Sequence, residues 1–464
     1  MAKKLLMIGS VALFSFILFL TIIKSNPILS LSEVNSKIVE IDSPSTDNSL
    51  LQQQSESTVT YVAWGGLNDD YGRRLALDSH ENIYTLDRTI SYGLIDSDLL
   101  LMKWTPDGEQ IWYRTWVGSG DDYGRGIAID SQDHVYTIGF TAESESMGEA
   151  EFILVAWDAT GIQLWNRTYS GSDEDRGFGV AVDASGNIYT VGSTGLYSFY
   201  QSDLLLVKWD SEGNQIWNRT WGGFNNDQGY GIITDDKGNI YTVGQTYSFG
   251  AGGRDLLLLK WDAEGNVVWN RTWGGVSYDE ARGITLGSDG SLYTAGRTDS
   301  FSNSYDLVLI KWNTNGTKLW RRTWGGSERD YGMGVAIDEN GDIYTAGHTE
   351  SFGEGGWDAA VVKWNSTGDL LGYITWGGSE WDKVWGIVVT NSGTVYTTGY
   401  TYSYGAGETD LVLVIAPSNV FSTSTYSYPS FPLRTPGFLY ISIFASFIVL
   451  SLLIMWKRRY KKKF

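Results

Sequence analysis

A repeating unit of about 52 residues constrains what this chain can fold into. Its most regular element is a Trp-Gly-Gly phrase, as in TWGGFNNDQGYGIITDDKGNIYTVGQT at 220–246 and TWGGSERDYGMGVAIDENGDIYTAGHT at 323–349. The aromatic residue of this phrase recurs at steps of 51 to 53 residues, at Trp64, Trp116, Tyr169, Trp221, Trp273, Trp324 and Trp376. Within each unit, short apolar runs alternate with Gly, Asn and Asp turns, which is typical of a four-stranded propeller blade. The sequence therefore predicts an all-β fold, a seven-bladed β-propeller.

The two ends of the repeat array complement each other. The last unit ends after its third strand, DLVLVIA at 410–416, whereas an extra strand, TVTYVAW at 58–64, precedes the first unit. We expect this N-terminal strand to complete the last blade, because a closed ring leaves only the outer strands as edges. Both ends of the propeller then lie on the face that carries the hairpin turns. The opposite face, built from the links between blades, is expected to look outward.

Hydrophobic segments flank the repeats and predict transmembrane segments at both ends. Residues 5–23 and 438–456 carry no charge, have about the length that crosses a bilayer, and lie beside Lys and Arg clusters that belong in the cytoplasm. The predicted organisation is a signal peptide or signal anchor at 1–23, a polar linker at 24–57, the propeller at 58–416, a Ser/Thr-rich stalk at 417–437, a transmembrane helix at 438–456 and a basic cytoplasmic tail at 457–464. The propeller is expected to be extracellular.

Composition excludes several kinds of chemistry. The chain has no Cys, which removes disulfides and thiolate catalysis, and its net charge of −20 disfavours nucleic acid as a partner. Five Asn-x-Ser/Thr sequons fit a glycosylated surface protein, at Asn166, Asn218, Asn270, Asn315 and Asn365.

The phrase WGGxxxDxGxGIAxDxxGNIYTxGxT, followed by DLLLxKWDxxGN, resembles the SBBP beta-propeller repeat family. The resemblance implies a propeller over 58–416 and, for function, a surface or secreted module without an assigned activity. In addition, TPGF at 435–438, followed by a hydrophobic span and basic residues, resembles the PGF-type sorting signals of archaeal surface proteins. That resemblance implies a C-terminus that is cut and replaced by a lipid.

Residues that are kept in all seven units are interpreted as structural. They include an Asp six residues after the anchor aromatic and a Thr twenty-five residues after it. A ring of cation-binding Asp carboxylates is the alternative, but Ca²⁺ needs six to eight oxygens converging on one point, so no metal site is predicted. Arginines on the outer strands are expected to discourage pairing with another chain, at Arg114, Arg167, Arg219, Arg271 and Arg322.

Residues that break the repeat are better candidates for a binding site. Aromatic residues occur at non-repeated positions in the loops of the outward face, at Tyr200, Tyr278, Tyr305, Trp357 and Trp381. Exposed aromatic rings stack on sugars or anchor a protein partner. Ordinary aromatic packing is the alternative.

No catalytic set can be assembled from the sequence. The run LVAWDATGIQLWN at 154–166 resembles the repeats of pyrroloquinoline quinone (PQQ) dehydrogenases, but the chain has seven units instead of eight and no evident central base. Its three histidines, His80, His134 and His348, occupy non-equivalent positions. We therefore predict a non-enzymatic, membrane-anchored surface propeller that uses no cofactor and binds a glycan or a protein. A structural envelope scaffold and a PQQ dehydrogenase are the alternatives, and the ligand, the oligomeric state and N-terminal cleavage stay open.

Overall fold

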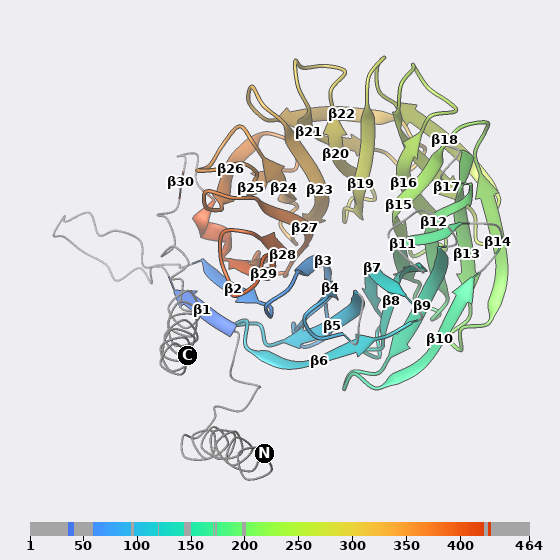
Figure 1. Ribbon diagram of the computed structural model, residues 1–464. Coiled ribbons are helices and arrows are strands. Elements are labelled where there is room, and N and C mark those ends of the chain that lie inside the picture. Colours follow the sequence, from blue (N-terminus) through green and yellow to red (C-terminus); the bar gives the residue numbers. More distant parts are fainter. Residues whose placement is uncertain are drawn as a thin grey trace, which may run out of the picture.

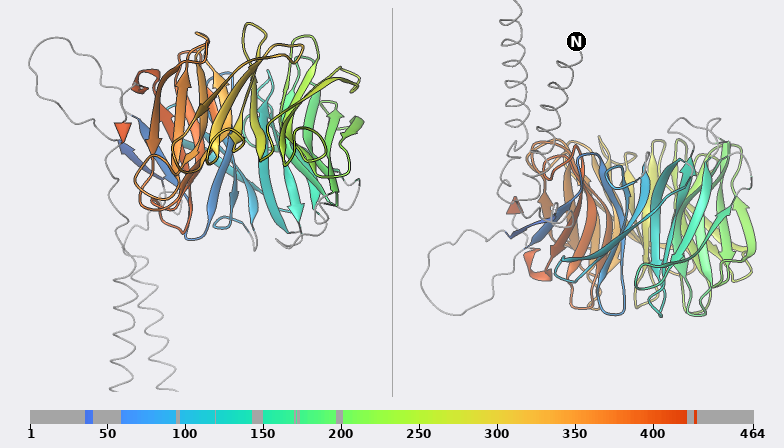
Figure 2. Two further views of the ribbon diagram at one scale, coloured as in Figure 1. Left: turned by 90° about the horizontal axis from the view of Figure 1, so that it is seen from above. Right: turned by 60° about the horizontal axis from the view of Figure 1, so that its bottom comes forward.

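The computed structural model describes residues 36–40, 59–93, 97–118, 120–142, 150–169, 171, 174–196, 201–421 and 426–427. In this part of the chain, seven antiparallel sheets surround a central axis (Figure 1). Seen from the side, the ring has loops at both of its ends (Figure 2). The seven-bladed, all-β propeller is confirmed.

The strands of each blade are called a, b, c and d from the axis outward. Blade 1 contains β3 (Asp70–Leu77), β4 (Ile83–Thr89), β5 (Asp98–Trp104) and β6 (Gln110–Trp116). Blade 2 contains β7 (Asp121–Ile129), β8 (Val135–Ala142), β9 (Glu151–Trp157) and β10 (Gln163–Tyr169). Blade 3 contains β11 (Asp175–Val182), β12 (Ile188–Leu196), β13 (Gln201–Trp209) and β14 (Gln215–Trp221). Blade 4 contains β15 (Asp227–Thr234), β16 (Ile240–Thr246), β17 (Asp255–Trp261) and β18 (Val267–Trp273).

The remaining blades follow the same order. Blade 5 contains β19 (Asp279–Leu286), β20 (Leu292–Thr298), β21 (Asp306–Trp312) and β22 (Lys318–Trp324). Blade 6 contains β23 (Asp330–Ile337), β24 (Ile343–Thr349), β25 (Asp358–Trp364) and β26 (Leu370–Trp376). Blade 7 contains β27 (Asp382–Val389), β28 (Val395–Thr401), β29 (Asp410–Ala416) and, as strand d, β2 (Thr60–Trp64). Outside this pattern lie β1 (Ser36–Glu40), β30 (Tyr426–Ser427) and the 3₁₀ turn η2 (Ser418–Val420).

Burial along each blade explains its sequence. Strand c is apolar at almost every position because neighbouring blades cover both of its faces; in β17, DLLLLKW, every residue except Lys260 is buried. The Trp that ends this strand, Trp261, donates a hydrogen bond through Nε1 to Thr242 Oγ1 at 3.0 Å. The same bond recurs in blades 1, 2, 3, 5 and 6 at 2.9 to 3.1 Å. Six of the seven blades are therefore fixed internally by the same buried polar contact, whereas strand c of blade 7 ends in Ala416.

The ring closes as the sequence predicts. Strand β2 pairs antiparallel with β29, and Thr60 lies opposite Ile415. Residues 60 and 416 therefore lie at the end of the ring that carries the a–b and c–d turns, here called the turn end. The other end, which carries the d–a links and b–c loops, is called the d–a end.

Two short strands outside the closed ring, β1 and β30, bear on which end of the propeller faces a membrane. Strand β1, within the predicted linker, runs back along β2, so that Ser36 lies opposite Trp64 at the d–a end. Strand β30 lies parallel to the last part of β26, with Ser427 opposite Thr375. Both flanking strands thus lead the chain toward the d–a end, and closure alone does not set which end faces a membrane.

The repeated Asp and Thr residues form a hydrogen-bonded junction between blades. Asp227 accepts hydrogen bonds from the backbone N–H of Gly223 at 2.8 Å, from Ser248 Oγ at 2.6 Å and from the Thr246 hydroxyl. Blades 5, 6 and 7 repeat the bonds to the Gly N–H and the Ser hydroxyl. No group of three or more His, Asp or Glu side chains that could hold a metal is found in the described ranges. These bonds agree with the structural interpretation of the repeated residues.

The outer-strand arginines have a role beyond the expected protection of edges. Arg271 donates through Nε to the carbonyl of Gly316 at 3.0 Å and through Nη2 to that of Asn315 at 2.8 Å. It also lies 5.0 Å over the ring of Trp269. Arg114, Arg167, Arg219 and Arg322 likewise donate to the c–d turn of the following blade. These arginines join neighbouring blades.

The predicted membrane segments at 5–23 and 438–456 lie outside the described residues. Among the residues that are described, no helix has the length and apolar character needed to span a bilayer.

Candidate functional site

One position of strand a points into the central channel from every blade. It lies three residues after the repeated Asp, and Gly occupies the position before it in most blades. The channel-lining position itself changes around the ring, through Arg73, Arg125, Phe178, Tyr230, Arg282, Met333 and Trp385. All seven side chains line the channel. The axis therefore has a chemistry that the repeat does not dictate.

The next position of strand a has one exception. Six blades carry Gly there, at Gly126, Gly179, Gly231, Gly283, Gly334 and Gly386, whereas blade 1 carries Arg74. The glycines let adjacent strands approach closely, since a Cβ placed on Gly283 would lie 3.0 Å from the Cα of Gly334. Arg74 instead extends its side chain into the channel and donates through Nη1 to the backbone carbonyl of Trp385.

The d–a part of the channel holds a cavity of about 200 Å³, here called the arginine cavity. Its cationic lining is Arg73, Arg74, Arg125, Arg176 and Arg282, and its other lining residues are Phe140, Phe178, Gln228, Tyr230 and Trp385. Toward the turn end the channel continues as a space of about 180 Å³, which Arg74 and Arg282 also line, together with glycines and apolar side chains such as Leu75, Ile232 and Val335. Apolar side chains thus become more frequent along the axis toward the turn end.

A second cluster, here called the rim band, lies at the d–a end over blades 4, 5, 6 and 7. It begins at Tyr278, whose ring is 5.2 Å from the guanidinium of Arg254. Arg254 forms an ion pair with Glu280 at 3.0 Å, and Glu280 pairs with Arg297 at 3.0 Å. Arg297 in turn lies 5.1 Å over the ring of Tyr305.

The rim band continues through aromatic contacts. Tyr305 meets Tyr331 edge-on at 5.3 Å, and Tyr331 packs on Trp357 at 4.7 Å. The ammonium of Lys383 lies 5.0 Å from the ring of Trp357 and 4.7 Å from that of Trp381. Four of the five predicted aromatics therefore belong to one network, linked by cations.

Charges within the rim band have strongly shifted pKa values. Burial alone would raise the pKa of Glu280, but Arg282, Arg297 and Arg254 outweigh it and hold the pKa at about 2. Burial lowers the pKa of Lys383 to about 8; Glu350 opposes this shift, while Arg329 and Arg73 add to it. Glu280 is therefore ionised at neutral pH, and Lys383 is only partly protonated in mildly alkaline solution.

The predicted aromatic residues differ in exposure. Tyr278 and Trp381 are exposed, at 43% and 51%, and Tyr305 is half-buried. Trp357 is only 4% exposed, so the expectation that its ring faces outward is wrong: it is enclosed by Tyr331, His348 and Lys383. Tyr200 lies outside the described residues.

The predicted sequons and histidines fall in varied settings. Asn166, Asn218 and Asn270 are exposed on strands d, and Asn315 is exposed in a c–d turn. Asn365 is half-buried, and its amide bonds to Thr367 and Asp369. His80 and His134 lie near carboxylates at the turn end. His348 is buried in the rim band, where burial, and after it Lys383, lowers its pKa well below the usual range.

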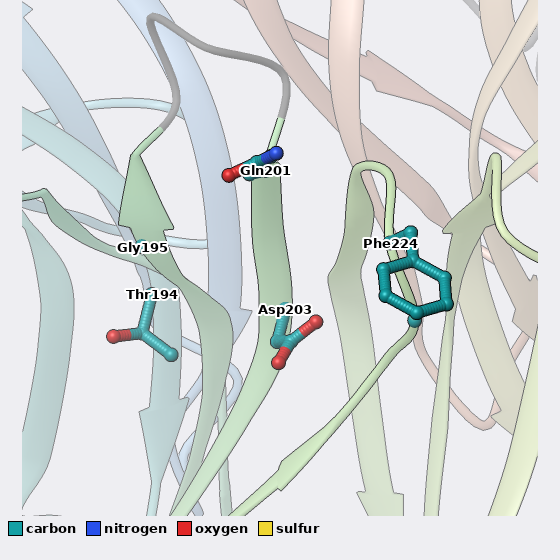
Figure 3. Close-up of a pocket in the computed structure, with 6 residues that line it drawn as sticks. Thr194, Gly195, Gln201, Asp203 and Phe224 are labelled. Atoms are coloured by element: carbon teal, nitrogen blue, oxygen red, sulfur yellow. The ribbon is translucent and has the colours of Figure 1, made fainter.

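A further hollow of about 420 Å³ opens at the d–a end between blades 3 and 4 (Figure 3). It is lined by Thr194, Gly195, Gln201, Asp203, Gly223 and Phe224. Phe224 is 94% exposed, and Asp203 is the only ionisable group in this lining. The hollow is a surface depression without an acid–base pair.

Comparison with known proteins bears on the repeat itself. Residues 221–250 and 319–352 match the family described as Beta-propeller repeat (SBBP). These two stretches are thus similar to SBBP repeats. Both SBBP matches begin on a strand d and end after the b strand of the next blade, so they include the d–a link and the channel-lining strand.

The chain is also similar to a longer protein. It is 23% identical over 249 residues to the regulatory protein FlaEY of Caulobacter vibrioides, a match that covers 43% of this chain and 26% of FlaEY. The matched part is thus about a quarter of that relative.

Two solved structures resemble the chain at 11% identity. The polysaccharide lyase Uly1 gives a TM-score of 0.46, with 75% of this chain and 90% of Uly1 covered. The β-propeller domain of the Trilobed protease from Pyrococcus furiosus gives 0.44, with 72% and 90% covered.

Proposed function

We propose that this chain is a non-enzymatic binding protein of the cell surface whose ligand, a surface glycan, docks on the rim band. The observation that carries the proposal is the pair of exposed rings, Tyr278 and Trp381, at the two ends of a continuous cation–aromatic network. Sugar rings stack on exposed aromatic faces, and neighbouring Arg and Lys groups donate hydrogen bonds to hydroxyls. The band belongs to four of the seven blades, which gives a near-symmetric ring one distinct binding sector.

The absence of catalysis is part of the proposal. Several carboxyls have pKa values that burial raises, the non-repeated Asp87 among them. Two of these carboxyls, Asp122 at about 6 and Asp358 at about 7, lie at the starts of strands that carry an Asp in most blades. Burial is the main cause of both shifts. Because a group repeated around a ring serves what every blade needs, these shifts support a structural role and not a single acid–base centre.

Location and anchoring complete the proposal. The propeller lies outside the cell and is held by the hydrophobic segments 5–23 and 438–456, whose length and basic flanks support membrane insertion. The exposed Asn166, Asn218 and Asn270 carry glycans on the outer strands. The rim band then faces other cells or the surrounding envelope.

Glycan binding by the purified full chain in detergent micelles tests the proposal. An array of envelope polysaccharides is probed with the natural sequence, with Tyr278→Ala and with Trp381→Ala. Phe224→Ala is the matched control, because Phe224 is exposed at the same end but outside the band. We expect saturable binding that weakens at least tenfold in both band variants and is unchanged in the control.

Two results would count against this function. Equal binding by all four proteins would place the ligand outside the rim band. Binding to no glycan, together with saturable binding to a surface protein that Trp381→Ala removes, would replace the glycan by a protein ligand. If nothing binds, the envelope scaffold becomes the better description.

A further inference from the structure

We infer that the arginine cavity binds an oxyanion group, a carboxylate, sulfate or phosphate carried on a unit of about one ring. The inference rests on the proposed function, because it makes the glycan an acidic one whose charged group enters the channel. Nothing in the repeat requires this site, since the residues that form it occupy the positions that vary from blade to blade.

Positive charge exceeds negative charge around the cavity. Five arginines line it, and the carboxylates that form ion pairs with them are Glu174, 3.5 Å from Arg176, and Glu280, 2.8 Å from Arg282. Glu280 is shared with Arg254 and Arg297. Within the described ranges, Arg73, Arg74 and Arg125 form no ion pair.

These three arginines also disfavour one another. Burial, and after it Arg282 and Arg73, lowers the pKa of Arg74 to about 10. Burial, then Arg73 and Arg282, lowers the pKa of Arg125 well below its usual range. Gathering cations in a partly buried space costs stability unless an anion neutralises them. The chain keeps this arrangement although its net charge is −20.

Aromatic stacking holds the guanidiniums but does not use their donors. Arg73 lies 4.5 Å over Trp385, and Arg125 lies 5.3 Å over Phe140 and 5.6 Å over Tyr123. A stacked guanidinium keeps its N–H groups in its own plane, free to bind an oxyanion in two-point fashion. The buried Nε of Arg125 has no hydrogen-bond partner in the described part of the chain.

The dimensions of the cavity limit the ligand. A cavity of about 150 Å³ accommodates benzene. The arginine cavity, at about 200 Å³, therefore holds one ring-sized unit with its anionic substituent. A folded polyanion is too large.

The ligand enters from the d–a end. The cavity lies among the first residues of the a strands, which begin at that end. Beyond the cavity the glycines bring adjacent a strands close together, and apolar side chains line the channel beside Arg74 and Arg282. Lys383, the last cation of the rim band, lies on the same strand as Trp385 of the cavity wall. A sugar stacked on Trp381 can thus direct an acidic neighbour inward.

Calorimetric titration of the full chain in detergent distinguishes the sources of the anion. The probes are D-glucuronate, its neutral counterpart D-glucose, inorganic sulfate, and acidic and neutral trisaccharides of matched length. The variants are Arg125→Met, which removes the charge, and Arg125→Lys, which keeps the charge but not the planar guanidinium with its paired N–H donors. Arg114→Met is the control, because Arg114 donates to carbonyls on the outer surface.

We expect glucuronate and the acidic trisaccharide to bind at least tenfold more tightly than their neutral counterparts, with an affinity that falls as salt rises. Arg125→Met removes this preference, Arg125→Lys keeps part of it, and Arg114→Met keeps it all. Binding of sulfate alone, lost in Arg125→Met, would support the oxyanion site while contradicting the glycan ligand. Equal affinity for acidic and neutral sugars, or an acidic preference that survives in folded Arg125→Met, would overturn the inference and leave the rim-band function standing.

Discussion

Arg74 donates a hydrogen bond through Nη1 to the backbone carbonyl of Trp385, joining the axial strands of the neighbouring blades 1 and 7. Arg74 lies where the other six blades have glycine, and the guanidinium of Arg73 lies over the ring of Trp385. The contact between the first and last blades is therefore also a wall of the arginine cavity. Several measurable consequences arise from such charged contacts.

Arg74→Gly should leave the fold intact. The variant removes a partly buried cation and restores the residue that the other blades carry, which offsets the lost hydrogen bond and the added chain freedom of glycine. We expect the free energy of unfolding in urea to change by less than about 1 kcal/mol, against about 2–5 kcal/mol for a typical large-to-small core change. Arg74→Ala controls for glycine flexibility. A loss above that range in both variants would show that Arg74 is structural.

Glu280→Gln should destabilise the propeller. Removing the one carboxylate that Arg254, Arg282 and Arg297 share leaves three cations without their counterion, at a cost of about 3–5 kcal/mol. Because the folded pKa of about 2 lies below the usual value of 4.5, this contribution is present above pH 4.5 and is lost as pH falls toward 2. Urea unfolding at pH 7 and pH 3 checks both statements. A natural protein and variant of equal stability at pH 7 would refute them.

Asp358 should make stability depend on pH in the opposite direction. Burial, with repulsion from Asp382, raises its pKa from 3.8 to about 7. The folded state favours the neutral acid, so its contribution is full below pH 4 and is lost as pH rises through 7, by an amount of the order of 2–4 kcal/mol. Asp358→Asn stays neutral and should flatten this dependence in unfolding measurements from pH 5 to 8. An unchanged slope would mean that Asp358 titrates normally.

Arg271→Met should loosen the contact between blades 4 and 5. It removes two hydrogen bonds to the carbonyls of Asn315 and Gly316 while keeping much of the apolar stem over Trp269. We expect a loss of about 1–2 kcal/mol in the free energy of unfolding. Lys237→Met is the control, since Lys237 is exposed in an a–b turn. Equal effects of the two changes would assign the loss to surface charge.

The sequence predicts the fold almost completely, because seven copies of one phrase show the turns, the buried c strands and the missing d strand. It also places Tyr278 and Trp381 at one end of the ring. It does not reveal the buried position of Trp357, because that burial depends on Tyr331, His348 and Lys383 from other strands. Loops alone cannot identify such neighbours.

The arginine cavity has a sequence signal of a different kind. In a strand whose first Asp is kept in every unit, the third position after that Asp changes from Arg73 to Met333 to Trp385. The prediction of a site from loop aromatics does not include this position. Arg73 and Arg282 line the same cavity because the ring closes, and no spacing in the sequence indicates that they meet.

Strand β2 leaves the ribosome first among the propeller strands, and its partner β29 leaves last. Joining them closes a loop of roughly 350 residues, at an entropic cost of about 5 kcal/mol, so a nascent chain completes this step late. The arginine cavity draws on blades 1, 2, 3, 4, 5 and 7 together, and an unclosed ring cannot hold them at the right separation. The proposed binding of an oxyanion on the axis therefore requires the closed ring, and it would report that folding is complete.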